Sequence, residues 1–171
     1  MACKSSPAAI EPMGEAAAFA ADFDEEELIL DHLTVSQELY DFTFTEVKHF
    51  VDNLNTTIRR KDYSGWKDAL SDGLFTHFSS PEFLAKASES NLLRSRKIIL
   101  KTPNDYFINV VVPSRSNSRV DEIEFTAHNT VKVFYLEKLE KKTENNAVVT
   151  ETRRLRLYEL EKSGDSWKII D

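Results

Sequence analysis

The hydrophobic period changes near residue 96, and this change constrains the fold more than any other feature. Before it, apolar residues recur at helical spacing in one stripe, formed by Val47, Phe50, Val51, Leu54 and Ile58. After it, apolar residues alternate along 121–139 and 148–160, which is typical of strands. Helices followed by a meander of strands predict an α+β fold, with helices covering one face of an antiparallel sheet.

Helix boundaries are predicted from capping residues. Thr43 and Glu46 fit a capping box, so we expect the first long helix to cover 43–61. A second helical stretch follows Gly65 and includes Trp66. Ser80 followed by a proline predicts a further helix start, because proline is favoured at the first helical position.

The strand half contains short and long segments. We expect short strands at 97–101 and 106–112, because both are apolar and the second is rich in β-formers. Segment 121–139 is predicted as one long strand with a bulge near Asn129. A turn at 141–146 leads to the next strand, whose apolar phase shifts between Leu157 and Tyr158, which predicts a second bulge. Gly164 then marks a closing hairpin.

Acidity is concentrated at the N-terminus. The formal net charge is -7, and residues 1–41 contain ten acidic residues and one basic residue. This alanine-rich, acidic stretch predicts a flexible tether over 1–41 and a single domain over 42–171. The domain itself is nearly neutral, which argues against nucleic acid as a partner.

Cys3 is the chain's single cysteine, and a small residue precedes it while a polar, Ser/Pro/Ala-rich stretch follows. This context resembles the start of a mature bacterial lipoprotein, in which the cysteine carries the lipid. The basic and apolar parts of a signal peptide are missing before it. We expect a lipid-anchored protein of the bacterial envelope; the alternative is a cytoplasmic protein with an ordinary thiol. No apolar run is long enough to span a bilayer.

The domain resembles the nuclear transport factor two-like superfamily, or cone fold. The resemblance rests on the long amphipathic helix, the following motif KDYSGWK at 61–67, and the closing hairpin LYELEKSGDSWKII at 157–170. It implies helices packed on a strongly curved antiparallel sheet, a cystatin-like α+β roll. The superfamily includes isomerases, dehydratases and many non-catalytic binding domains, so fold alone does not select a function.

Residues that could line the cavity of such a fold are few. The weak ligand-binding candidates are His77, Tyr106, His128 and Tyr135, with Asp72 as a further ionisable group. None matches a catalytic motif of the superfamily, so we expect no enzyme; the alternative is an isomerase or dehydratase. The four histidines are widely separated and no cysteine pair exists, so neither a metal site nor a cofactor is expected.

Two basic clusters are candidates for an interaction surface. One contains Arg94, Arg96, Lys97 and Lys101; the other contains Arg153, Arg154 and Arg156. On a strand, Arg154 and Arg156 share a face and Arg153 lies on the opposite one. Each cluster could bind an anionic ligand, a lipid headgroup or the acidic tether. The alternative for the second cluster is a solvated sheet face, with pairing to Glu151, Glu137 or Glu124.

The combined hypothesis is a non-catalytic module that binds a small apolar ligand or another protein. Its membrane contact would be the lipid anchor, and the cone-fold resemblance implies a possible homodimer. Under this hypothesis, reversing the charges of Arg154 and Arg156 alters partner capture without altering the melting temperature.

Overall fold

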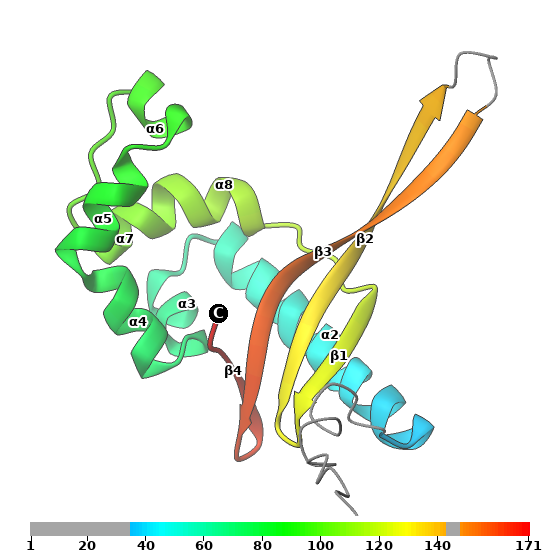
Figure 1. Ribbon diagram of the computed structural model, residues 1–171. Coiled ribbons are helices and arrows are strands. Elements are labelled where there is room, and N and C mark those ends of the chain that lie inside the picture. Colours follow the sequence, from blue (N-terminus) through cyan, green and yellow to red (C-terminus); the bar gives the residue numbers. More distant parts are fainter. Residues whose placement is uncertain (1–34, 143–147) are drawn as a thin grey trace, which may run out of the picture.

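A computed structural model describes residues 35–142 and 148–171 (Figure 1). The helical half comes first and the sheet follows, as predicted for an α+β fold. Its helices are α2 (Gln37–Arg59), α3 (Tyr63–Ala69), α4 (Asp72–Ser79), α5 (Pro81–Ser88), α6 (Asn91–Ser95), α7 (Pro103–Tyr106), the π-helical turn η1 (Phe107–Val111) and α8 (Val112–Arg115). Its strands are β1 (Glu122–Ala127), β2 (Thr130–Lys142), β3 (Val148–Ser163) and β4 (Ser166–Ile169).

Helix α2 begins earlier than predicted. Ser36 is its N-cap, and the Ser36 hydroxyl accepts a hydrogen bond from the Leu39 N–H. Thr43 therefore lies inside the helix, where it is buried, and the capping box predicted there is wrong. The predicted apolar stripe does face the sheet, because Val47 and Val51 are fully buried in the main core. The first turn of α2 overlaps the predicted tether, and residues 1–34 lie outside the described residues.

The four strands form one antiparallel sheet in the order β1-β2-β3-β4. The predicted bulge in the second long strand is confirmed, because Val133 pairs with Tyr158 and Phe134 pairs with Arg156, leaving Leu157 as the extra residue. The closing hairpin is confirmed as well, with Gly164 at φ +62°, a conformation that glycine adopts without strain. The predicted turn at 141–146 falls largely outside the described residues.

Segment 121–139 is a hairpin rather than one bulged strand. Ala127 pairs with Thr130, so the chain reverses through His128 and Asn129. Alternating apolar residues continue across the turn, which hid the reversal in the sequence pattern.

The sheet is neither strongly curved nor closed, which corrects the prediction of a cone-like roll. β1 has six residues and β4 has four, so the edges of the sheet are short. β2 and β3 extend beyond them as a two-stranded ribbon that projects from the body of the molecule (Figure 1). A ribbon without flanking strands twists freely instead of wrapping around a helix.

The predicted strands at 97–101 and 106–112 are wrong. Residues 103–115 are helical, because Thr102 and Asp105 form a capping box and Pro103 occupies the first turn. These caps override the β propensity of the valine-rich stretch. Residues 98–101 form no strand, and the Leu100 N–H donates instead to the Ser88 hydroxyl at 2.9 Å.

Helices pack on one face of the sheet and create two hydrophobic clusters. The main core joins α2, Trp66, Phe107 and the inward-facing residues of the strands. A smaller cluster contains Leu84, Leu93 and Leu100, below helices α5 and α6. The link between α3 and α4 reaches the edge of the sheet, where the Ser71 N–H donates to the Ile169 carbonyl at 2.8 Å. This bond positions the short helices over the end of β4.

Candidate functional site

A cavity of about 350 Å³ lies between the short helices and the sheet, and we call it the central cavity. Its apolar lining comes from both layers and consists of Leu54, Trp66, Leu70, Leu74, Phe78, Val110, Val111, Leu157 and Ile169. The polar lining is limited to Tyr106, Ser114, Arg115, Tyr158 and Asp171. An apolar hollow of this size with few polar groups is typical of small-molecule sites.

Stacked aromatic rings build the helical wall of the central cavity. The Trp66 ring stacks on Phe107 with centroids 4.9 Å apart and on Phe78 with centroids 6.1 Å apart. Tyr106 contacts Phe78 at 5.0 Å between centroids. Trp66 is placed by helix α3, whose start is fixed by the Asp62 side chain accepting from the Gly65 N–H. Packed rings of this kind contribute stability beyond their buried area.

Two tyrosines supply hydroxyl groups at the cavity. Burial raises the pKa of Tyr106 above its ordinary value, although the nearby Arg115 charge partly opposes this effect. Burial also raises the pKa of Tyr158, and Ser118 and Arg115 oppose it. Both phenols are therefore protonated at neutral pH and can donate hydrogen bonds.

Arg115 and Asp171 are the charged residues that line the cavity. The Arg115 guanidinium lies over the Tyr158 ring, 5.5 Å from its centroid. Within the described ranges Arg115 forms no ion pair. The Asp171 carboxylate is 61% exposed and pairs with Arg156 at 2.5 Å, and Arg156 also pairs with Glu159. The polar lining of the cavity thus contains one cation without an ion pair among the described residues, two phenol hydroxyls, and a carboxylate that is paired elsewhere and solvated.

Of the four cavity residues predicted from the sequence, only Tyr106 lines the central cavity. Tyr135 lines a neighbouring hollow of about 260 Å³, which shares Ser114 and Leu157 with it. His77 is exposed on α4 and packs on Phe83, with ring centroids 4.8 Å apart.

His128, the fourth candidate, and Asp72, the further ionisable group, lie on the surface. His128 is in the exposed turn between β1 and β2, and Asp72 is exposed in the first turn of α4. The structure therefore separates these groups instead of gathering them.

Sequence reasoning missed Arg115 and Tyr158 as cavity residues. Arg115 follows a segment that the sequence predicted as a strand, and the helical residues 103–115 that bring it to the cavity were not recognised. Tyr158 faces inward because the bulge at Leu157 resets the phase of β3. The phase shift was visible in the sequence. The contact between Tyr158 and Arg115 was not, because it depends on the helical segment 103–115.

A wider surface groove of about 570 Å³ separates α2 and α3 from the final hairpin. Polar residues, among them Glu46, His49 and Asp68, line one side and Trp167 lines the other. The Trp167 indole N–H is buried and has no hydrogen-bond partner among the described residues. Of these lining residues, Glu46 pairs with Lys162 at 2.6 Å.

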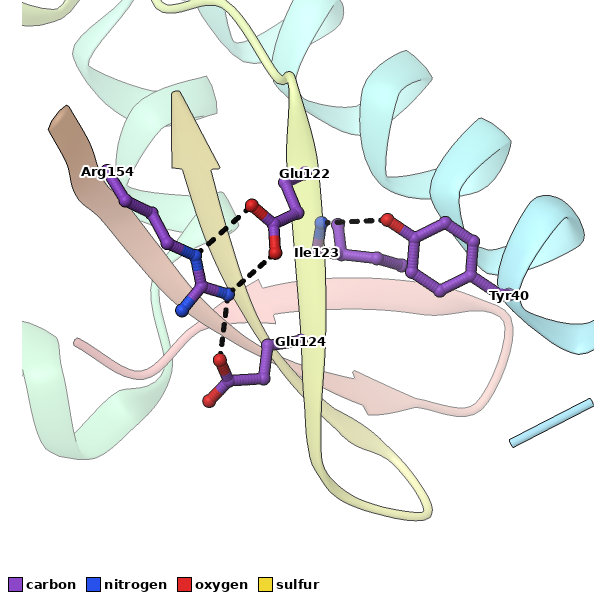
Figure 2. Close-up of polar contacts among 5 residues, drawn as sticks. All are labelled: Tyr40, Glu122, Ile123, Glu124 and Arg154. Carbon is purple, nitrogen blue, oxygen red and sulfur yellow. Dashed lines mark hydrogen bonds and ion pairs between the residues drawn. The ribbon is translucent and has the colours of Figure 1, made fainter. Parts of the chain in front are cut away.

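The second arginine cluster lies on both faces of the sheet, as the strand period predicted. Arg154 pairs with Glu122 at 2.9 Å and with Glu124 at 2.7 Å on the face away from α2. Figure 2 shows this arrangement and, on the opposite side of β1, the Ile123 N–H directed at the Tyr40 hydroxyl of α2. The Arg154 guanidinium also lies over the Phe134 ring, 3.6 Å from its centroid. Arg154 is therefore already engaged by two acids and a ring.

The other two arginines differ from Arg154. Arg156 pairs with Glu159 and Asp171. Arg153 is exposed and lies opposite Glu137 in the register of β2 and β3.

The described parts of the chain contain neither a cluster of metal ligands nor a membrane-spanning helix. No group of three or more His, Cys, Asp or Glu side chains is arranged to hold a metal ion there. No helix in those ranges has the length and apolar character needed to cross a bilayer. Cys3, the predicted lipidation site, lies outside the described residues.

Comparison with known proteins gives one informative similarity. No protein-family model matches the chain. No solved structure matches it. The chain is 31% identical over 136 residues to a protein of Treponema pallidum (strain Nichols) named "Uncharacterized lipoprotein". The alignment covers 80% of this chain and 65% of the relative, so the chain spans less than two thirds of the relative's length. The chain is therefore a distant homologue of a lipoprotein, without a family or fold assignment.

Proposed function

We propose that this chain is a non-catalytic binding domain for a small amphiphile with an apolar body and an anionic head. The observation that carries the proposal is the central cavity, an apolar hollow of about 350 Å³ with Arg115, Tyr106 and Tyr158 at its polar side. The stacked rings of the helical wall offer a rigid apolar surface for the body of the ligand. A preformed apolar site needs few ordered polar groups to bind with useful affinity.

The anionic head follows from the charge distribution of the cavity. Arg115 has no carboxylate partner in the described ranges, and the two phenols beside it are donors. A carboxylate or sulfonate would accept from all three groups, and hydrogen bonds to a charged acceptor are the stronger ones. Asp171, the other charged lining residue, is paired with Arg156 and 61% exposed, so solvent screens its charge.

The protonation of the two cavity tyrosines and the positions of the histidines favour binding over catalysis. An isomerase or dehydratase of the runner-up type requires a general base with a pKa near the working pH. Burial raises the pKa of Tyr106 and Tyr158, so neither phenol is a base at neutral pH. The two histidines considered as cavity residues, His77 and His128, are exposed.

The cellular setting proposed is the bacterial envelope, with a lipid on Cys3 as the anchor. The similarity to the Treponema pallidum lipoprotein supports this setting, as does the sequence context of Cys3. The order of helices and antiparallel strands is also compatible with an opened relative of the cone fold, which stays part of the proposal.

Ligand binding is tested with two probes on the full chain, 1-anilinonaphthalene-8-sulfonate and octanoate. We expect the fluorescent probe to bind and octanoate to displace it, because both combine an apolar body with an anionic head. Arg115→Gln should weaken octanoate binding about tenfold, since a hydrogen bond to a charged group is lost. Val110→Phe should weaken both probes by filling the cavity.

Ile108→Phe is the matched control, because Ile108 belongs to the same helical segment but does not line the cavity. It should bind both probes as the parent chain does. Equal loss in both phenylalanine variants, or probe binding that octanoate never displaces, would reject the cavity as the site.

The anchor is tested at the level of the gene and of the membrane. The coding region before Met1 should contain an in-frame basic and then apolar segment, as export of a lipoprotein requires. Cys3→Ser should then move the protein from the membrane fraction to the aqueous fraction. Absence of such a segment would favour the cytoplasmic alternative.

A further inference from the structure

Helices α5 and α6, with the segment that leads to Lys101, form a lobe at one end of the molecule (Figure 1). We call residues 81–101 the basic lobe. In Figure 1 it lies beyond the C-terminal end of α2, far from the N-terminal end of that helix. The lobe has its own small cluster of buried residues, formed by Leu84, Leu93 and Leu100. It is therefore a packed element rather than a loose loop.

Two large apolar side chains of the basic lobe face solvent. Leu92 is 51% exposed and Ile99 is 72% exposed, whereas their neighbours Leu93 and Leu100 are buried. Each exposed side chain is directly next to a core residue, so the local backbone directs one of the pair inward and the other outward. The exposure of Leu92 and Ile99 is thus a consequence of the packing of the lobe.

Backbone hydrogen bonds fix the turn that joins Leu92 to Ile99. The Ile98 N–H donates to the Leu93 carbonyl at 2.9 Å, which holds the segment of Ile99 against α6. The Lys97 N–H donates to the Arg94 carbonyl at 3.0 Å, and Lys97 adopts a left-handed φ of 57° in this tight turn. The short segment 92–99 thus combines two exposed apolar residues with three of the cations in an ordered turn.

The lobe is strongly basic. Five cations, Lys86, Arg94, Arg96, Lys97 and Lys101, lie within the lobe, whose acidic residues are Glu82 and Glu89, so its formal net charge is +3. All five are exposed, and within the described part of the chain none forms an ion pair. This differs from the arginine cluster on β3, where Arg154 and Arg156 are neutralised by neighbouring acids.

We propose that the basic lobe docks on the surface of a membrane that contains anionic lipids. The five cations would lie among the lipid phosphates, and Leu92 and Ile99 would enter the boundary between headgroups and acyl chains. Each cation near an anionic surface raises partitioning roughly fivefold. Such docking goes beyond the ligand-binding proposal and does not depend on the central cavity.

The positive charge of the basic lobe could also attract the acidic N-terminal segment of the same chain. Helix α2 has 23 residues, which corresponds to about 35 Å. The acidic run 22–27 begins 13 residues and ends 8 residues before Val35, so extended chain reaches at most about 46 Å from its far end and about 28 Å from its near end. The near end of the run is thus too close to the start of α2 to reach the lobe, whereas the far end is not. A membrane surface is the occupant that accommodates both the cations and the exposed Leu92 and Ile99.

Vesicle co-sedimentation of the unlipidated full chain tests the proposal. The vesicles are phosphatidylcholine alone, or phosphatidylcholine with a minor fraction of phosphatidylglycerol. We expect binding to the anionic vesicles that falls steeply with added salt. Arg94→Gln with Arg96→Gln should reduce partitioning more than tenfold. Leu92→Ser with Ile99→Ser should reduce it severalfold and leave the thermal unfolding unchanged, because neither side chain is buried.

The matched control removes two exposed cations elsewhere, Arg60→Gln with Lys138→Gln, and should bind nearly as the parent chain does. The proposal is overturned by a chain that ignores anionic vesicles, or by equal losses in the control and in the Arg94/Arg96 variant. If vesicles fail to bind the chain while the Arg94/Arg96 variant reduces self-association in sedimentation velocity, the occupant is a second copy's acidic segment.

Discussion

Asn55 of helix α2 exchanges two hydrogen bonds with the backbone of Ser118, which lies 63 residues further along the chain. The Asn55 amide donates to the Ser118 carbonyl at 2.7 Å, and the Ser118 N–H donates to the Asn55 side-chain oxygen at 3.0 Å. Asn55 is only 6% exposed. One side chain therefore joins the sheet-facing helix to the segment that enters β1, where the Ser118 hydroxyl also donates to the Arg115 carbonyl at 3.3 Å.

Asn55→Leu should lower the free energy of unfolding by about 2–3 kcal/mol, because both backbone groups of Ser118 lose their partner in a partly buried position. Urea unfolding measures the change. Asn53→Leu, an exposed position on the same helix, should stay within about 0.5 kcal/mol of the parent chain. Similar values for the two variants would contradict the structural role of this pair.

Arg154→Glu should destabilise the sheet by about 1–2 kcal/mol. The substitution places a third carboxylate beside Glu122 and Glu124 and removes the cation above Phe134. This revises the expectation, made from the sequence, that charge reversal on this strand leaves the melting temperature unchanged. Thermal unfolding at low salt measures the effect, which should shrink as salt is added.

A charge swap separates repulsion from general damage to the strand. Adding Glu122→Lys and Glu124→Lys to the Arg154→Glu chain should restore most of the lost stability, because opposite charges again face each other. The same two lysines in the parent chain should destabilise it. Absence of rescue would mean that the ion pairs seen at this site contribute little in solution.

Asp121 predicts a defined pH dependence. Its carboxylate accepts from the Arg119 guanidinium at 2.7 and 2.9 Å and from the Leu136 N–H at 2.8 Å. The Arg119 hydrogen bonds, with the Leu136 N–H as a further donor, hold its pKa below the ordinary value. The unfolded chain therefore binds this proton more readily, and the stabilisation is present above about pH 4 and lost as the pH falls through the lowered folded pKa.

The measurement is urea unfolding of the parent chain and of Asp121→Asn over a pH series. The parent chain should be more stable at neutral pH, and the difference should shrink below about pH 4. Arg119→Gln should show the same convergence, because it removes the partner of the same carboxylate. A difference that stays constant with pH would exclude the charge as its cause.

The sequence predicts the layered architecture better than it predicts the site. The stripe from Val47 to Ile58 and the strand alternation are periodic over many residues, so the α+β class and the face of α2 could be inferred. The bulge at Leu157 was equally visible as a shift of phase. These features are local, and each repeats the same signal several times.

The central cavity depends on a helix whose local signals conflict. Residues 107–112 have β-forming side chains, but the capping box of Thr102 and Asp105 makes them helical. That helix brings Arg115 to Tyr158, a contact between residues 43 positions apart in the printed sequence. Long-range contacts of this kind depend on tertiary packing, and the hydrophobic periodicity of the sequence does not reveal them. The curvature of the sheet could not be predicted either, because it depends on the relative lengths of neighbouring strands.

The two tryptophans offer a last test, because they report on different parts of the molecule. Trp66 lines the central cavity, whereas Trp167 lines the surface groove and has a buried N–H without a partner among the described residues. Trp167→Phe should therefore change the free energy of unfolding little. The smaller ring loses some packing, but the substitution also removes the buried N–H that has no partner. In that variant, octanoate should shift the emission of Trp66 in proportion to its occupancy of the cavity. Trp66→Phe, which leaves Trp167 as the reporter, should show no such shift. A response from Trp167 instead would move the ligand site to the groove between α2 and the final hairpin.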